Sequence, residues 1–437
     1  PGGNNLHRNV IFRDGIDRTG QVYPFSQYDS ADPEDLWDYM AAYEEKTGGQ
    51  VLAIAHNGNL SNGLMFDVET LTTKEPLDKD YATMRARYEP LYEVTQIKGD
   101  GEAHPLLSPH DEFADFETLD AGNISGSVAK TREMLPGEYA RSALLRGLLF
   151  EKEIGVNPFK FGMVGSTDAH NAIPSTREEN NFSKAHIVEP DPKRIEYTLV
   201  EGVQPELSIM SADLGASGLA AVWARENTRE AIWDAMSRQE TYATTGTRLR
   251  VRVFAGWDFE EEEVSRPDFA RQGYARGVPM GGDLTAPPES SDNGESKAPT
   301  FMVRALRDPD GANLDRVQII KGWLDSEGKT HEKIYDLAVS DGREIGPDGR
   351  CKVPVGSTID LSGPTFTNTI GAALLSAYWV DPEFDASQSA FYYVRVIEIP
   401  TPRWTAYDAV KFDIEMPEGT KMTVQDRAYT SPIWYTP

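Results

Sequence analysis

Residues 1–250 alternate short apolar segments with segments of helical periodicity, and this alternation constrains the fold more than any other feature. The strongest strand signal is 51–55, an apolar run that follows two glycines and ends at His56. Such a run is typical of a strand buried on both faces of a parallel sheet. The alternation therefore predicts a parallel α/β domain, and in barrels of that type functional residues gather where the strands end.

Further elements support this prediction. A helix is expected from Pro33 to the glycines at 48 and 49, because Asp32 is a good N-cap and proline suits the first helical turn. Thr228 has the same capping chemistry ahead of a later helix. The remaining expected elements of this half are strands at 9–12, 92–97 and 159–165 and a long helix at 137–154.

The pattern changes after Arg250. Segments 249–254, 300–303, 316–320 and 391–399 alternate apolar and polar residues between Gly, Pro and Asp turns, which is typical of β-strands. We therefore expect two domains, an α/β domain at 1–250 and a β-rich domain at 251–437. The polar, proline-rich and serine-rich segment 286–299 is expected to be a mobile loop, and the C-terminal tail is a candidate to return to the first domain.

Composition limits the partners of this chain. It carries 70 Asp and Glu against 43 Lys and Arg, a net charge of −27, so we expect no nucleic-acid binding, which requires basic residues. An anionic small molecule would need a local pocket or metal ions. No apolar run is long enough for a membrane span, and the single Cys351 excludes an internal disulfide and a thiolate metal cluster. A cytoplasmic and a periplasmic or secreted location both stay open, as does the oligomeric state.

Three side chains follow predicted strands and suggest a metal site. Asp168 and His170 stand two residues apart, where both can reach one cation, and His56 ends the apolar strand. An Asp-x-His triplet alone is more often a hydrogen-bonded surface pair. The imidazole of His56 at the same rim makes a metal site the better interpretation.

Other candidates have open alternatives. His7 precedes a strand and suits either a metal site or a core histidine, and Lys98, Glu102 and His104 are either substrate-binding rim residues or ordinary loop residues. Arg248 and Arg403 are each either an anion clamp or part of a connection between elements. We interpret the other histidines as structural or surface residues.

Several strings together resemble a known family. These are NNLHRNVIFRDG, VLAIAHNGNLS, the loop 98–105 ahead of LLSPHDEFADFE, VNPFKFGMVGSTDAHNA, TREAIWDAMSRQETYATTGTR and RAYTSPIWYTP. The chain resembles a mostly uncharacterised bacterial family within the PHP superfamily, named for polymerase and histidinol phosphatase. The resemblance implies a distorted (β/α)7 barrel that holds two or three divalent ions, such as Zn, Mn or Fe.

Residue by residue, the resemblance implies that His7, His56, Asp168 and His170 are metal ligands, with Asp168 and His170 catalytic and Asp168 near the attacking water. The early H-x-H motif of the superfamily, a following Asp/His motif and a Glu are missing. The chain is therefore expected to match the C-terminal two thirds of such a protein, without its N-terminal strands.

The implied activity is metal-dependent hydrolysis of a small phosphate ester by activated water. Lys98, Arg248 and Arg403 would orient the anion. One alternative is hydrolysis of a carbamate, ester or amide, because metal-activated water does not by itself distinguish phosphorus from carbon. A second alternative is a non-catalytic protein that binds a metal or a glycan.

Overall fold

The computed structural model describes residues 3–215, 217–284 and 297–437. Residues 286–296 of the predicted mobile loop lie outside the described residues. The helices are α1 (Ile16–Thr19), α2 (Pro33–Thr47), α3 (Lys79–Tyr88), α4 (Ala140–Ile154), α5 (Arg229–Ser237), α6 (Phe269–Arg276) and α7 (Trp404–Phe412). No described helix is long and apolar enough to cross a membrane.

The first sheet contains the predicted apolar strand. Its members are β1 (Arg8–Phe12), β2 (Val51–His56), β3 (Leu91–Gln96), β4 (Gly99–Asp100) and β5 (Gly162–Gly165). Strands β2, β3 and β5 are parallel, with His56 paired to Glu93 and Glu93 to Val164. β1 and β4 run antiparallel to their neighbours. The carboxyl ends of three strands therefore meet at one edge of this sheet.

The helices next to this sheet begin where the sequence predicts. The Asp32 side chain accepts a hydrogen bond from the backbone N–H of Glu34 at the start of α2, and Gly48 ends the helix with φ 64°. A left-handed backbone conformation at that position suits glycine, which has no Cβ to clash. Thr228 accepts from the backbone N–H of Ala231 at the start of α5. These predicted N-caps are confirmed.

The C-terminal half is mainly β, as predicted. A four-stranded sheet contains β10 (Arg250–Gly256), β11 (Gly277–Pro279), β13 (Thr300–Leu306) and β16 (Leu374–Val380). An eight-stranded sheet contains β8 (Leu219–Val222), β9 (Thr241–Thr244), β12 (Asp283–Leu284), β14 (Leu314–Leu324), β15 (Thr330–Val339), β17 (Ala390–Glu398), β20 (Arg427–Thr430) and β21 (Ile433–Tyr435). Side chains of these two sheets form one hydrophobic core, so the sheets face each other in two layers. Two small pairs are β6 (Thr198–Val200) with β7 (Ile209–Met210) and β18 (Thr401–Pro402) with β19 (Thr423–Val424).

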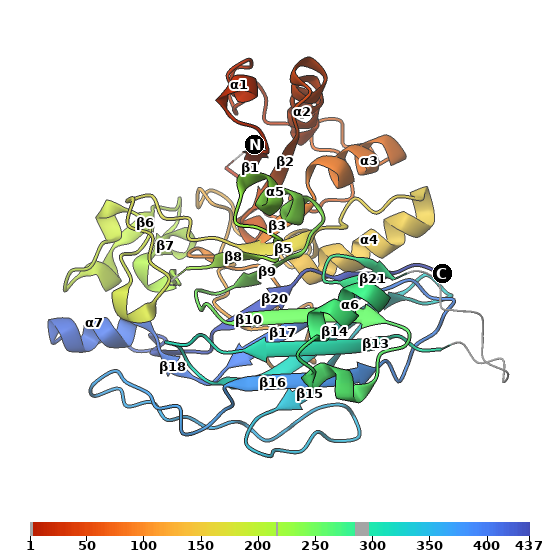
Figure 1. The fold of residues 1–437 in the computed structure, drawn as a ribbon. Helices are drawn as coiled ribbons and strands as arrows, with labels where there is room; N and C mark the ends of the chain where they lie inside the picture. Colours follow the sequence, from red (N-terminus) through yellow and green to blue (C-terminus); the bar gives the residue numbers. More distant parts are fainter. Residues whose placement is uncertain (1–2, 216, 285–296) are drawn as a thin grey trace.

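The predicted (β/α)7 barrel is wrong. A barrel would need β8 and β9, but β9 pairs instead with β20 near the C-terminus, and β8 pairs with β9. The first sheet has only three parallel strands among the described residues and does not close. The eight-stranded sheet therefore takes strands from both sides of residue 250, and Figure 1 shows β8 and β9 between β5 and β20.

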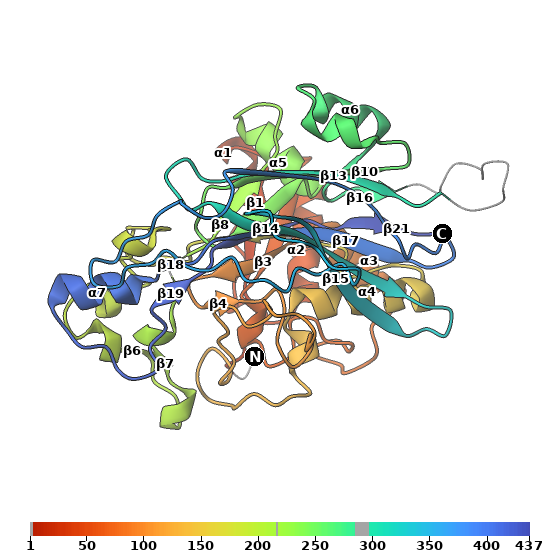
Figure 2. The same cartoon turned by 90° about the horizontal axis from the view of Figure 1, so that it is seen from below.

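The two halves share a core. Residues of α4, β2 and β3 form one hydrophobic cluster with Ile320, Phe391 and Trp434 from the eight-stranded sheet. The Ser431 side chain also accepts a hydrogen bond from the backbone N–H of Met163, 3.0 Å away, and thereby ties the C-terminal segment to β5. Figure 2 shows α4 against β14 and β15 in a second view. The sheet that carries the candidate site thus packs against residues of the C-terminal half.

Candidate active site

The candidate site lies at the edge where β2, β3 and β5 end. β2 ends at His56, β3 presents Glu93 directly beside it, and β5 is followed by residues 166–170. Because parallel strands place their carboxyl ends at one edge, three segments distant in sequence meet here. The structure brings together five of the predicted site residues, namely His7, His56, Lys98, Asp168 and His170.

Glu93 orients the ring of His56. Its carboxylate lies 2.9 Å from Nδ1 of His56 and also accepts a 2.5 Å hydrogen bond from the Ser166 hydroxyl. In this contact Nδ1 of His56 donates to the carboxylate of Glu93, and Nε2 is the ring nitrogen on the opposite side. That Nε2 atom lies 3.9 Å from Oδ1 of Asp168. An imidazole nitrogen and a carboxylate oxygen therefore face each other across a short gap.

Asp168 is the centre of the cluster. Its side chain is 8% exposed and its backbone adopts φ 48°, a left-handed conformation that Asp and Asn tolerate better than most residues. Oδ2 of Asp168 contacts the ammonium groups of Lys98 and, at 2.6 Å, Lys184. Burial would raise the pKa of Asp168, but Lys98, His56 and Lys184 hold it well below its usual range. The carboxylate is therefore ionised at neutral pH.

His170 lies on the solvent side of Asp168. Its imidazole is 63% exposed, and Nε2 lies 3.1 Å from Oδ1 of Asp168 and 3.1 Å from the Lys184 ammonium group. The backbone N–H of His170 donates to the carbonyl of Lys184 at 2.6 Å. Burial, followed by the charge of Lys98, lowers the pKa of Lys184 to about 8. The site thus presents an imidazole and an ammonium group beside one carboxylate.

His7 completes the group of imidazoles. Its ring lies parallel to that of His56, with centroids 6.0 Å apart, and its backbone carbonyl accepts from the N–H of His56. Burial, followed by the positive charges near His56 and Lys98, lowers the pKa of His7. A neutral imidazole at neutral pH keeps a lone pair available for a ligand.

The donor atoms of this cluster match a divalent ion in chemistry. Imidazole nitrogen and carboxylate oxygen suit Zn²⁺, Mn²⁺ and Fe²⁺, and a carboxylate on the far nitrogen of a histidine is the usual support of a metal ligand. No three His, Cys, Asp or Glu side chains in the described ranges already stand at metal-binding spacing. Lys98 and Lys184 instead contact the Asp168 carboxylate.

The other predicted substrate-binding residues have partners elsewhere, so the structure does not join them to Asp168. Glu102 is buried and pairs with Arg141 and Arg395. His104 contacts Asp120 at 2.9 Å. Arg248 pairs with Asp308 and Asp310, and Arg403 is 1% exposed and pairs with Glu117. Glu102, His104 and Arg403 are buried with these partners, whereas Arg248 is exposed. A role of these four residues in substrate binding stays a prediction.

Sequence reasoning missed Glu93 and Lys184. Glu93 had a detectable signal, because a carboxylate inside a buried parallel strand is costly unless it has a partner. Lys184 had none, since it lies in an irregular segment that lacks periodicity. Glu93 contacts His56 and Lys184 contacts Asp168, and the sequence did indicate these two contacted residues.

Comparison with known families gives a match over the whole chain. The family described as "Protein of unknown function (DUF3604)" matches residues 1–437, so the chain belongs to the DUF3604 family. No curated protein matches the chain. The resemblance to the PHP superfamily stays a prediction.

Proposed function

We propose that the chain is a metal-dependent hydrolase that acts on a small phosphate ester. One observation carries the proposal: Nε2 of His56 and Nε2 of His170 both face Oδ1 of Asp168, at 3.9 and 3.1 Å. Two imidazoles and one carboxylate that converge on one point are a common ligand set for a catalytic divalent ion.

His7, His56, Asp168 and His170 would hold the metal, with Zn²⁺, Mn²⁺ or Fe²⁺ as candidates. When bound, a divalent ion acidifies a water molecule and polarises the substrate oxygen. The ammonium groups of Lys98 and Lys184 contact the Asp168 carboxylate and must move away from it when a cation binds. Metal binding and the Lys98 and Lys184 contacts are therefore expected to compete.

The protein residues supply orientation and charge. Glu93 fixes the ring of His56 and directs its Nε2 atom toward Asp168. Asp168 accepts a hydrogen bond from the attacking water and so directs its lone pair. Lys98 and Lys184 are the cations that neutralise the phosphate oxygens, which explains how a chain of net charge −27 could accept an anion.

The proposal is tested by metal analysis and a substrate panel. Elemental analysis of purified protein should find at least one tightly bound divalent ion per chain, and chelation should abolish hydrolysis that Zn²⁺, Mn²⁺ or Fe²⁺ restores. Phosphate monoesters and diesters are assayed beside aryl carbamates and carboxylic esters. Turnover of the carbon esters alone would replace the phosphatase assignment. Absence of both stoichiometric metal and metal-restored hydrolysis would favour a binding protein.

A further inference from the structure

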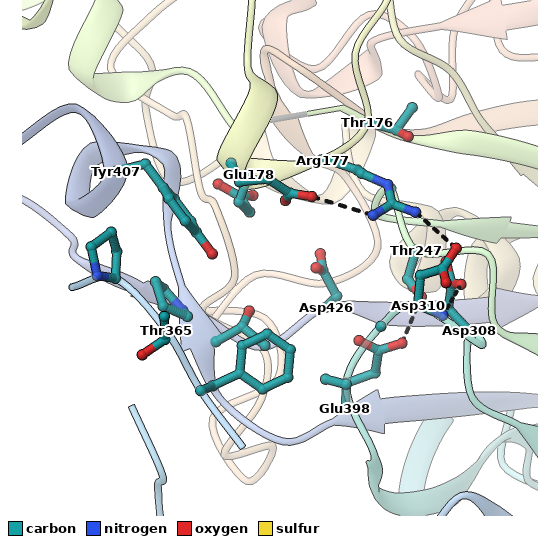
Figure 3. Close-up of a pocket in the computed structure, with 18 residues that line it drawn as sticks. Thr176, Arg177, Glu178, Thr247, Asp308, Asp310, Thr365, Glu398, Tyr407 and Asp426 are labelled. Carbon is teal, nitrogen blue, oxygen red and sulfur yellow. Dashed lines mark hydrogen bonds and ion pairs between the residues drawn. The ribbon is translucent and has the colours of Figure 1, made fainter. Parts of the chain in front are cut away.

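A cavity lies outside the His–Asp cluster, by which we mean His7, His56, Asp168 and His170. It has a volume of about 330 Å³ and lies among the loop after His170, the ends of β9, β13 and β17, and helix α7 (Figure 3). Small-molecule sites typically have volumes of roughly 300 to 1,000 Å³. The cavity is therefore large enough for an organic ligand and much larger than a bare ion.

The wall of this cavity is unusually acidic. Six carboxylates line it, namely Glu178, Glu179, Asp308, Asp310, Glu398 and Asp426. Arg177 is the one basic side chain among the described lining residues, and it pairs with Glu179 and Asp310, while Asp308 pairs with Arg248. Glu178, Glu398 and Asp426 form no ion pair with any described residue.

These three carboxylates, which we call the acidic triad, present unpaired oxygens to the cavity. Glu398 is 2% exposed; one of its oxygens accepts a 2.6 Å hydrogen bond from Thr247, and the other has no donor among the described residues. Asp426 accepts on one oxygen from Thr245 at 2.6 Å, and Figure 3 shows its carboxylate pointing into the middle of the cavity. Glu178 accepts from the backbone N–H of Trp404 at 2.6 Å.

The electrostatics of the triad favour a cationic occupant. Burial, followed by the charge of Asp426, raises the pKa of Glu178 to about 8 and that of Glu398 well above its usual value. Burial raises the pKa of Asp426 to about 6. The cations that also face these groups are Arg307, Arg403 and Arg427, and the acids are Glu117, Glu179 and Asp308. A bound cation would relieve the repulsion and release protons.

We propose that the acidic triad binds a small aliphatic amine, with a diamine the best match. The aromatic side chains of Phe366 and Tyr407 line the same cavity and suit both an alkyl chain and an ammonium group. Two features favour an amine over a metal ion. The cavity exceeds the space that a bare ion occupies, and no three carboxylates of the described chain stand at metal-binding spacing.

The test is titration calorimetry of the whole chain with 1,4-diaminobutane, with 1,4-butanediol as the neutral counterpart. The diamine should bind and the diol should not. Binding heats measured in buffers of different ionisation enthalpy should show proton release at neutral pH. Asp426→Asn and, separately, Glu398→Gln should weaken binding at least about tenfold, since each removes a charge-assisted hydrogen bond. Both amides can keep the hydroxyl contact that the native side chain accepts.

Asp348→Asn is the matched control, because it removes one negative charge from an exposed residue outside the cavity. It should leave diamine affinity unchanged. Circular dichroism establishes that each variant is folded. The proposal is overturned if the diamine does not bind, if it binds Asp426→Asn and Glu398→Gln as tightly as the native chain, or if Ca²⁺ binds through these residues and the diamine does not.

Discussion

Glu93 and His56 lie side by side on adjacent parallel strands, with the Glu93 carboxylate 2.9 Å from Nδ1 of His56. This contact is the feature by which the scaffold controls the candidate site. It selects the tautomer of the imidazole and directs Nε2 toward Asp168. The position of Glu93 on a central strand makes the orientation rigid.

Glu93→Gln should therefore weaken metal binding without unfolding the chain. We expect about a 10- to 100-fold lower affinity for Zn²⁺, since loss of a carboxylate behind a histidine ligand has effects of that size. Zn²⁺ competition with a chromogenic chelator measures it. Ser166→Ala is the control, because it removes the hydroxyl from the same carboxylate but leaves Glu93 itself in place. Equal affinities in Glu93→Gln and the native chain would contradict the role.

Asp168→Asn should abolish metal-dependent hydrolysis. The amide removes the negative charge that both imidazoles face, and we expect a loss in kcat/KM of more than about 100-fold. Asn also tolerates the left-handed backbone of this residue, so the fold should be retained. His170→Ala, at an exposed position, should give a loss of similar size. Full activity in either variant with normal thermal unfolding would exclude the residue from catalysis.

Asp111→Asn should destabilise the protein strongly at neutral pH. Asp111 is buried between Arg395 at 2.7 Å and Arg141 at 2.8 Å, and removal of one partner from such a network costs about 3–5 kcal/mol. Urea unfolding at pH 7 measures this loss.

The stabilising effect of Asp111 should become smaller in acid, where urea unfolding can also measure it. Burial would raise the pKa of Asp111, but Arg395 and Arg141 lower it well below its usual value. The carboxylate therefore stabilises the fold above the pKa of the unfolded chain, about 4, and loses this effect as the pH falls further. The difference between native and variant protein should shrink at pH 3. A difference that stays constant would contradict the electrostatic origin.

Asp426→Asn should change stability in the opposite sense. Burial raises the pKa of Asp426 from 3.8 to about 6, so the folded state disfavours the charged form. This penalty is absent below pH 4, grows between pH 4 and 6, and is constant above. The variant should therefore match the native protein near pH 4 and exceed its free energy of unfolding by roughly 1 to 3 kcal/mol at pH 8. Chemical unfolding at both pH values tests this, with Asp348→Asn as the surface control.

Local features of the fold could be predicted from the sequence. The apolar run before His56, the N-caps at Asp32 and Thr228 and the change to β-strands after Arg250 all depend on neighbouring residues. The barrel prediction was wrong because strand partners are chosen by contacts distant in sequence. Nothing in residues 219–244 indicates that β9 pairs with β20.

In the candidate site, too, local features could be predicted and contacts between distant residues could not. His56 and Asp168 could be found because each follows a strand that the sequence predicts. The ion pairs of Glu102 and Arg403 could not be predicted, since their partners Arg395 and Glu117 lie far away along the chain. No local pattern distinguishes an arginine that will be neutralised in the interior from one that will meet a substrate.

The pairing of β9 with β20 also limits how this protein can change. A fragment that stopped at residue 250 would expose the edge of β9 that β20 covers, and unpaired strand edges invite aggregation. The His–Asp edge thus cannot be transplanted as a module by recombination at the apparent domain boundary. The two halves must therefore stay together in one chain. Substitutions in the β half that disturb this pairing would also disturb the half that carries the candidate site.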